Sequence, residues 1–85
     1  MRIELARVAA GAAEHADLLQ NIGARAFEAA GLLHEQSSAE ELIRAAHDVR
    51  GLALHAFAVL AELQFYAGRM QALSALRQAT ESSRA

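Results

Sequence analysis

Cysteine, proline, lysine and tryptophan are all absent from this 85-residue chain, and aromatic residues are few. The lack of cysteine excludes a disulfide framework and thiolate metal sites. The lack of proline leaves long stretches free to form uninterrupted helices. Three Phe and one Tyr stand against 22 Ala. Helices packed through such a sequence approach closely but bury little apolar area per residue.

Charge is sparse and evenly spread. Eight Arg oppose ten acidic residues, which gives a formal net charge of −2, and no block of like charge occurs. Nucleic-acid binding requires a basic face that neutralises phosphates, so we expect no nucleic-acid partner.

The sequence also gives little sign of export or membrane insertion. Met1-Arg2-Ile3-Glu4 places an acid where a signal peptide would begin its apolar region. The most apolar run, residues 52–67, is interrupted by His55, Glu62 and Gln64 and is shorter than the ~20 residues of a membrane span. We therefore expect a soluble, cytoplasmic protein with no membrane partner.

Two apolar series with a period of 3.5 residues dominate the chain. The first comprises Leu5, Val8, Ala12, His15, Leu19, Ile22, Ala26, Ala29 and Leu33. The second comprises Ala39, Leu42, Ala46, Val49, Ala53, Ala56, Leu60, Leu63, Ala67 and Met70. Each series predicts a long helix whose seam is buried against another helix. His15 is the polar residue of the first seam, and polar seam residues commonly fix register and oligomeric state.

The turn between the two helices has its own signal. Ser38 followed three residues later by Glu41 is a capping box, which predicts that the second helix begins near Ser38. We expect one domain, 1–85, with helices over about 2–33 and 38–78, a turn at about 34–37 and a frayed tail at 79–85. A turn this short makes the helices antiparallel. Their unequal lengths favour a break, first near Gly68 and otherwise near Gly11 or Gly51.

The middle of the second helix is apolar on nearly every side, and such a helix is buried on several sides. One antiparallel neighbour cannot supply that burial. We therefore expect an all-α hairpin, or three helices if a break occurs, that assembles as a homodimer or higher oligomer into a four-helix bundle. Asp48, His55, Glu62 and Arg69, spaced by sevens, form the polar stripe left for solvent. The expected packing and association residues are Leu19, Ile22, Leu54, Phe57, Leu60, Leu63 and Tyr66.

One short segment carries chemistry. Ala46-His47-Asp48-Val49-Arg50-Gly51-Leu52-Ala53, preceded by residues 41–45, resembles the helix of histidine-phosphotransfer domains over about residues 41–53. That resemblance implies that His47 accepts a phosphoryl group, that Arg50 contacts it and that Gly51 gives a receiver domain room to approach. In the alternative interpretation, His47 and Arg50 are ordinary exposed residues beside the seam.

Other candidate sites have weaker signals. Arg50 and His55 have the Arg-x4-His spacing found in helical HEPN-type ribonucleases, or they are simply one Arg and one His on a helix surface. The four histidines contain no pair at i, i+3 or i, i+4, and no Glu-x-x-His occurs, so we expect no metal site and no cofactor.

The leading functional hypothesis is a small non-enzymatic interaction module of the adaptor, chaperone or inhibitor type. It would bind itself and a partner protein through apolar helix surfaces. The alternative is a phosphotransfer intermediate with His47 as the phosphoryl carrier.

Overall fold

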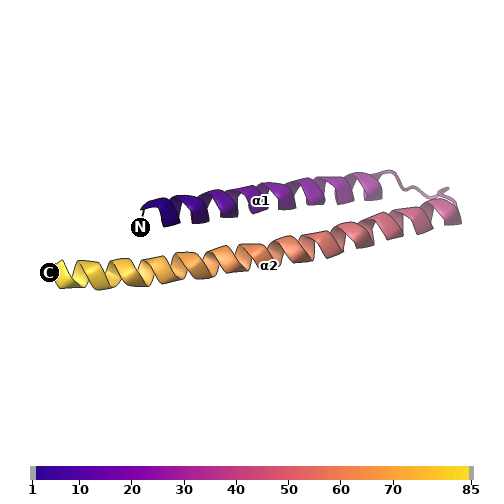
Figure 1. Ribbon diagram of the computed structural model, residues 1–85. Coiled ribbons are helices and arrows are strands. Elements are labelled where there is room, and N and C mark those ends of the chain that lie inside the picture. Colours follow the sequence, from indigo (N-terminus) through magenta and orange to yellow (C-terminus); the bar gives the residue numbers. More distant parts are fainter. Residues whose placement is uncertain (1, 85) are drawn as a thin grey trace.

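The chain forms a long antiparallel helical hairpin. The computed structural model describes the backbone of residues 2–84 and the side chains of residues 4–83. Helix α1 spans Arg2–Gly31 and helix α2 spans Ala39–Arg84 (Figure 1). The described residues contain no strand, and the molecule measures 69 × 17 × 14 Å. The predicted all-helical fold is therefore confirmed, while assembly of the hairpin into a bundle stays a prediction.

The turn follows the chemistry of its serines. The backbone amide of Glu41 donates to Ser38 Oγ at 3.1 Å, and the amide of Ser38 donates to Glu41 Oε1 at 3.3 Å. These reciprocal bonds form the predicted capping box and begin α2. One turn earlier, the amide of His34 donates to Ser37 Oγ at 2.9 Å, and the amide of Gln36 donates to His34 Nδ1 at 3.1 Å.

Both helices are continuous, which corrects the expectation of a break. α1 passes through Gly11, and α2 passes through Gly51 and Gly68, without interruption. α2 also continues to Arg84, beyond the end expected near residue 78, while Ala85 lies outside the described residues. Glycine lowers helix stability by only about 1 kcal/mol, so an otherwise favourable sequence tolerates it. The lengths stay unequal, and the C-terminal end of α2 projects past the start of α1 (Figure 1).

The seam of α1 follows the first apolar series. From Val8 to Leu33, every member of that series is buried or half-buried, and only Leu5, at 37% exposed, lies just outside this range. The predicted seam position of His15 is among the half-buried ones. The 3.5-residue period alone was therefore sufficient to identify the packed side of α1.

The predicted seam of α2 is wrong along one of its two lines, where the residues that pack against α1 come one position earlier in the sequence. Ala56 and Leu63 are half-buried as expected, but Leu42, Val49 and Met70 of the same line are 49%, 38% and 41% exposed. The companion line Ala46, Ala53, Leu60 and Ala67 is exposed throughout. The residues that pack there instead are Ala45, Leu52, Val59, Tyr66 and Leu73. This line carries larger side chains, and the alanine-rich seam of α1 has room for them. The two neighbouring lines have the same period, and the line that buries more apolar area per residue is the one that packs inside the hairpin.

Close packing is greatest where Tyr66 of α2 crosses α1. A Cβ placed on Gly11 would lie 2.6 Å from Tyr66 Cε1 and Cζ, so the ring occupies the space that a side chain would need. His15 Nδ1 donates to the Gly11 carbonyl oxygen at 2.8 Å, and its ring centroid lies 5.3 Å from that of Tyr66. Gly11, His15 and Tyr66 therefore lie together between the two helices.

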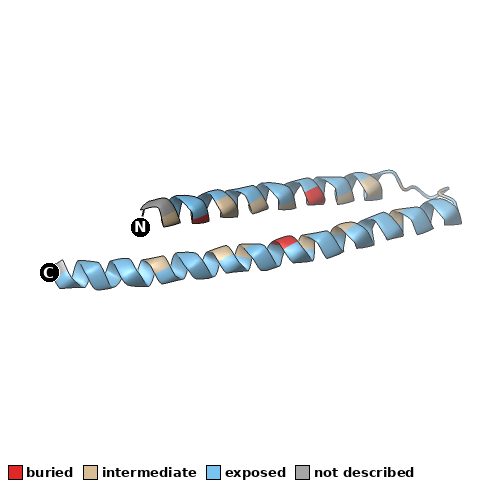
Figure 2. Cartoon of the chain, viewed as in Figure 1, coloured by how far each residue is buried: buried red, intermediate tan, exposed pale blue. Residues whose placement is uncertain are grey.

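The core of a single hairpin is very small. Only Val8, Ile22 and Val59 are buried among the described side chains, and Figure 2 shows them as isolated positions among exposed ones. The radius of gyration is 19.8 Å, against about 12 Å for a compact domain of this length. Most of the apolar surface of the hairpin is therefore still in contact with solvent.

Candidate functional site

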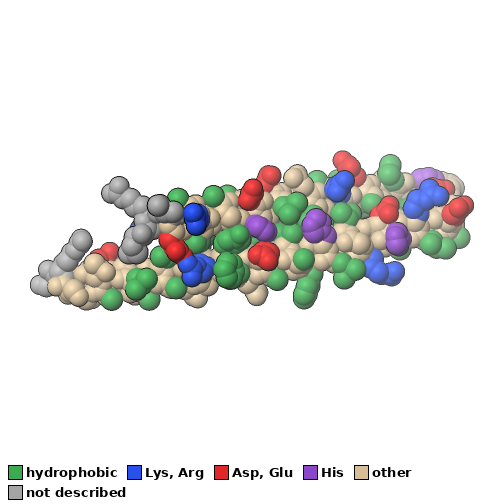
Figure 3. Space-filling model, in the orientation of Figure 1, with side chains coloured by type: hydrophobic (Ala, Val, Ile, Leu, Met, Phe, Trp, Pro, Cys, Tyr) green, Lys and Arg blue, Asp and Glu red, His purple; other side chains and the backbone are tan. Residues whose placement is uncertain are grey.

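The hairpin has one lateral side that is rich in charge. Each helix has a line of residues, spaced by seven, on either flank of its seam. In an antiparallel pair, equivalent flanking lines of the two helices lie beside each other on the same side of the seam. On one such side, Arg69 of α2 forms an ion pair with Glu4 of α1. We call this surface the charged side, and Figure 3 shows it as the face where histidine, arginine and acidic side chains gather along both helices. Its charged members are Glu4, Arg7, Glu14, Arg25, Glu28, Glu41, Arg44, Asp48, Glu62 and Arg69.

The opposite lateral side has small and apolar residues instead. We call it the uncharged side. It consists of one line of residues from each helix, with a spacing of seven, and of one residue of each helix that flanks its line. The lines are Ala9, Ala16, Gly23 and Ala30 of α1 and Ala46, Ala53, Leu60 and Ala67 of α2, and the flanking residues are Phe27 and Phe57. All of these residues are exposed. Arg50 is the only charged residue on this side between residues 6–30 of α1 and 39–78 of α2.

Several large apolar side chains on the uncharged side, and one beside it, are exposed to solvent. Phe27 is 81% exposed, Phe57 is 74% exposed and Leu60 is 48% exposed, while Leu54, on the outermost line of α2, is 70% exposed. Leu19, Ile22, Leu63 and Tyr66 lie between the two helices. The residues expected to act together in packing and association thus fall into two groups, one inside the hairpin and one on its outside.

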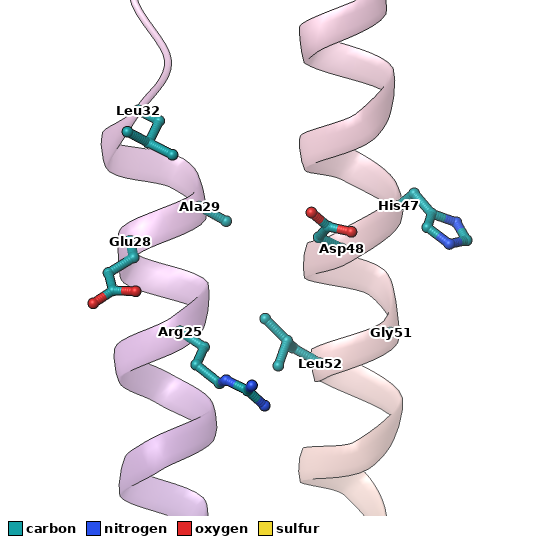
Figure 4. Close-up of a pocket in the computed structure, with 8 residues that line it drawn as sticks. All are labelled: Arg25, Glu28, Ala29, Leu32, His47, Asp48, Gly51 and Leu52. Atoms are coloured by element: carbon teal, nitrogen blue, oxygen red, sulfur yellow. The ribbon is translucent and has the colours of Figure 1, made fainter.

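The His47 motif lies on the outside of α2. His47 is exposed, and its ring points away from α1, whereas Asp48 points toward α1 (Figure 4). Arg50 is exposed and lies three residues on, so it shares the outward face with His47. A Cβ on Gly51 would meet nothing within 4 Å. The structure therefore leaves His47, Arg50 and Gly51 accessible to another protein.

The groove beside this motif is open and of mixed charge. Arg25 and Glu28 of α1 and Asp48 of α2 line about 570 Å³ of space between the helices near the turn (Figure 4). Small-molecule sites usually enclose most of their ligand within apolar walls. This groove opens broadly to solvent and has both signs of charge, so it lacks the enclosure that selective binding of a small molecule requires.

The remaining candidate residues do not form a site within one chain. Arg50 and His55 lie five residues apart, which places them about 140° apart around the helix axis. They therefore point to different sides and do not form a joint site. Among the described residues, no three His, Asp or Glu side chains come close enough together to hold a metal ion.

One described helix, α2, contains an 18-residue window with a mean hydropathy of 1.2, which passes a test of length and composition for a membrane span. Only 6% of that window is buried in the hairpin. Glu62 and Arg69 lie on the flank of α2 that faces the charged side. Hydropathy alone therefore does not distinguish a helix that lies against lipid from one that lies against protein.

The chain matches no protein-family model, and no curated protein or solved structure matches it either.

Sequence reasoning missed the uncharged side because of the error in the α2 seam. The series that contained Ala53, Leu60 and Ala67 placed these residues in the hairpin core, where they could not form an outer surface. The missed signal was that Leu52, Val59 and Tyr66, one residue earlier in each heptad, are the larger set. Of these two adjacent apolar lines, the one with the larger side chains packs inside the hairpin and the one with the smaller side chains stays exposed.

Proposed function

We propose that this chain is a small, non-enzymatic helical interaction module that works in the cytoplasm, without a cofactor, through the exposed apolar surface of α2. It binds a second copy of itself and a partner protein, as adaptors, chaperones and small inhibitors do. It acts neither on nucleic acid nor as a membrane span. The observation that carries the proposal is the exposure of Leu54, Phe57 and Leu60 on one helix.

Two physical arguments support this reading. Burying a Leu or Phe side chain contributes roughly 1.5–3 kcal/mol, so several exposed ones form a strong drive for association. The charge distribution adds to this, because most ionic groups lie on the charged side. Arg50, four residues before Leu54, is the one charged residue three or four positions from Leu54, Phe57 or Leu60 on this helix. A helix with such a face binds apolar faces of other helices.

Site-specific photo-cross-linking in the native host tests the proposal. A photoreactive amino acid at Leu54 is expected to cross-link the chain to another protein, because this position is exposed and apolar. The same amino acid at Glu62, on the charged side of the same helix, is the matched control. If both positions give the same products, Leu54 does not lie in a binding surface and the proposed function is wrong.

Phosphotransfer is the second candidate, and the exposure of His47 together with the open space at Gly51 favours it. In this mechanism, an imidazole nitrogen of His47 attacks the phosphorus of an aspartyl phosphate on a receiver domain. The aspartyl carboxylate leaves, and the phosphoryl group is held on His47. Arg50 would neutralise part of its charge.

The test is incubation with a phosphorylated receiver, followed by detection of acid-labile label. Label that is lost in His47→Gln and kept in His55→Gln would support phosphotransfer, since His55 is an exposed histidine on the same helix. Absence of label in the unmodified chain, or its persistence in His47→Gln, would exclude His47 as the carrier.

A further inference from the structure

We propose that the uncharged side is covered by a second copy of this chain, packed antiparallel so that α2 lies against α2 and α1 against α1 of the partner copy. The two hairpins then form a four-helix bundle with a two-fold axis near Leu60 of α2 and Ala16 of α1. This inference rests on the proposed function and specifies which surface self-association uses.

The exposed area of one hairpin matches what such a dimer requires. The hairpin exposes 6855 Å², whereas a compact monomer of its 9.1 kDa mass would expose about 4,900 Å². The excess is therefore roughly 2,000 Å² per chain. Stable interfaces bury about 800 Å² per partner, and obligate homodimers bury more. A second copy is a partner large enough to cover this excess.

Charge decides which side of the hairpin is covered. Placing the charged side in an interface would remove its many ionised groups from water, and each unpaired one costs several kcal/mol. Between residues 6–30 of α1 and 39–78 of α2, the uncharged side has a single ionised group, Arg50, at its margin. Its alanines allow helices to approach closely, while Phe27, Phe57 and Leu60 supply the apolar area. Burial of this side is therefore favourable.

The lengths of the helices favour the antiparallel arrangement. α2 has 46 residues and α1 has 30, so part of α2 has no neighbour within its own hairpin. An antiparallel α2 of the partner copy, with the axis near Leu60, provides a neighbour for that projecting part. The same arrangement keeps the two Arg50 side chains far apart, whereas a parallel pair of α2 helices would place these like charges side by side.

The sequence of the α2 line is symmetric about Leu60. With the two-fold axis there, Leu60 meets its own copy and Ala53 meets Ala67 of the partner subunit, a small residue against a small one. Because Gly11 lies against Tyr66, Ala16 of α1 is level with about Leu60. With the axis level with Ala16, Ala9 of α1 falls against Gly23 of the partner subunit, a small residue against a small one, and Phe27 falls level with Leu5 of the partner subunit. One axis thus satisfies both helices.

Disulfide trapping tests the arrangement, because the chain has no cysteine of its own. Under mild oxidation, Leu60→Cys is expected to form a covalent dimer, since a disulfide requires Cα atoms within about 7 Å. Ala53→Cys mixed with Ala67→Cys is expected to give the mixed dimer. Glu62→Cys, two residues from the axis but on the charged side, is the matched control and is expected to stay monomeric. Self-cross-linking of Arg50→Cys, or equal trapping at Leu60 and Glu62, would overturn the arrangement.

Sedimentation of a matched pair of variants tests the interface without cross-linking. Phe57→Glu is expected to raise the dimer dissociation constant at least about tenfold, because two copies of the charge enter the interface. Phe65→Glu makes the same substitution at an exposed Phe near Arg7 on the charged side and is expected to leave the constant unchanged. Equal effects of the two variants would contradict the proposal.

The inference and the proposed function fail in different ways. A folded chain that sediments as a monomer, but still cross-links another protein from Leu54, would overturn the second copy and leave the interaction module standing. A monomer that floats with phosphatidylcholine vesicles would show that lipid, not a second copy, covers the apolar surface. A dimer trapped at Leu60 that does not float supports the inference.

Discussion

The ring of Tyr66 lies where a side chain on Gly11 would be. The ring atoms Cε1 and Cζ are 2.6 Å from the position that a Cβ on Gly11 would take, and Oη is 2.7 Å from it. The contact joins the middle of α2 to the first half of α1. It explains why a residue that weakens isolated helices is useful at this position.

Gly11→Ala and Gly51→Ala are expected to change stability in opposite directions. At Gly51 a methyl group enters open space, so alanine should stabilise α2 by up to ~1 kcal/mol. At Gly11 it overlaps the Tyr66 ring, and the overpacking should outweigh the gain in helix propensity and destabilise by about 1 kcal/mol. Urea unfolding of both variants at one protein concentration measures the difference.

A double variant separates the overlap from other causes. In a Tyr66→Ala background the ring is gone, so Gly11→Ala should become neutral or stabilising. If Gly11→Ala destabilises equally with and without the ring, the contact with Tyr66 is not what requires glycine.

The capping box at the start of α2 gives the second prediction. Ser38→Ala removes the acceptor for the Glu41 amide and is expected to cost about 1 kcal/mol, whereas Ser38→Asp retains a capping oxygen and should cost much less. Thermal unfolding followed by circular dichroism measures both. Equal losses for Ala and Asp would show that the hydroxyl does not act as a cap.

Val59 and Leu60 are adjacent but lie in different environments, which gives the third prediction. Val59 is 4% exposed and Leu60 is 48% exposed. Val59→Asp places a carboxylate between α1 and α2, which should cost several kcal/mol at every protein concentration. Leu60→Asp should act mainly by weakening association, so raising the protein concentration should restore its stability.

Chemical unfolding at two protein concentrations, a hundredfold apart, distinguishes these effects. A Leu60→Asp variant that is as unstable as Val59→Asp at both concentrations would place Leu60 inside the hairpin and contradict the corrected seam.

The ion pair between Glu4 and Arg69 is expected to contribute little. Both side chains are more than 40% exposed, and exposed pairs typically contribute 0.2–1 kcal/mol. A double-mutant cycle with Glu4→Gln and Arg69→Gln should give a coupling energy in that range at low salt and less at 1 M salt. A coupling energy of several kcal/mol would mean that this pair, and not the apolar seam, joins the open ends of the helices.

The helices, the turn and its cap were predictable because each depends on local signals. Apolar residues recur with the helical period, and Ser38 and Glu41 have the spacing of a capping box. The seam of α1 was equally accessible because its large apolar residues lie on a single side of the helix, with charged residues on one flank and only alanine and glycine on the nearest line of the other. Local rules sufficed wherever only one side of a helix was apolar.

Local rules failed where α2 is apolar all round. Both Leu60 and Val59 fit a 3.5-residue repeat, and the choice between them depends on how their size fits the alanine-rich seam of α1. The apolar pattern also could not predict that α2 continues through Gly68, because the small cost of a glycine and the gain from continuing the helix nearly balance.

Sedimentation equilibrium of the unmodified chain tests the central claim most directly. Over micromolar concentrations, we expect the mass of two 9.1 kDa chains, with a shift toward one chain only on dilution. The mass of a single chain at tens of micromolar, with the helical circular dichroism spectrum intact, would show that a lone hairpin is stable with its apolar surface in water and that no second copy covers it.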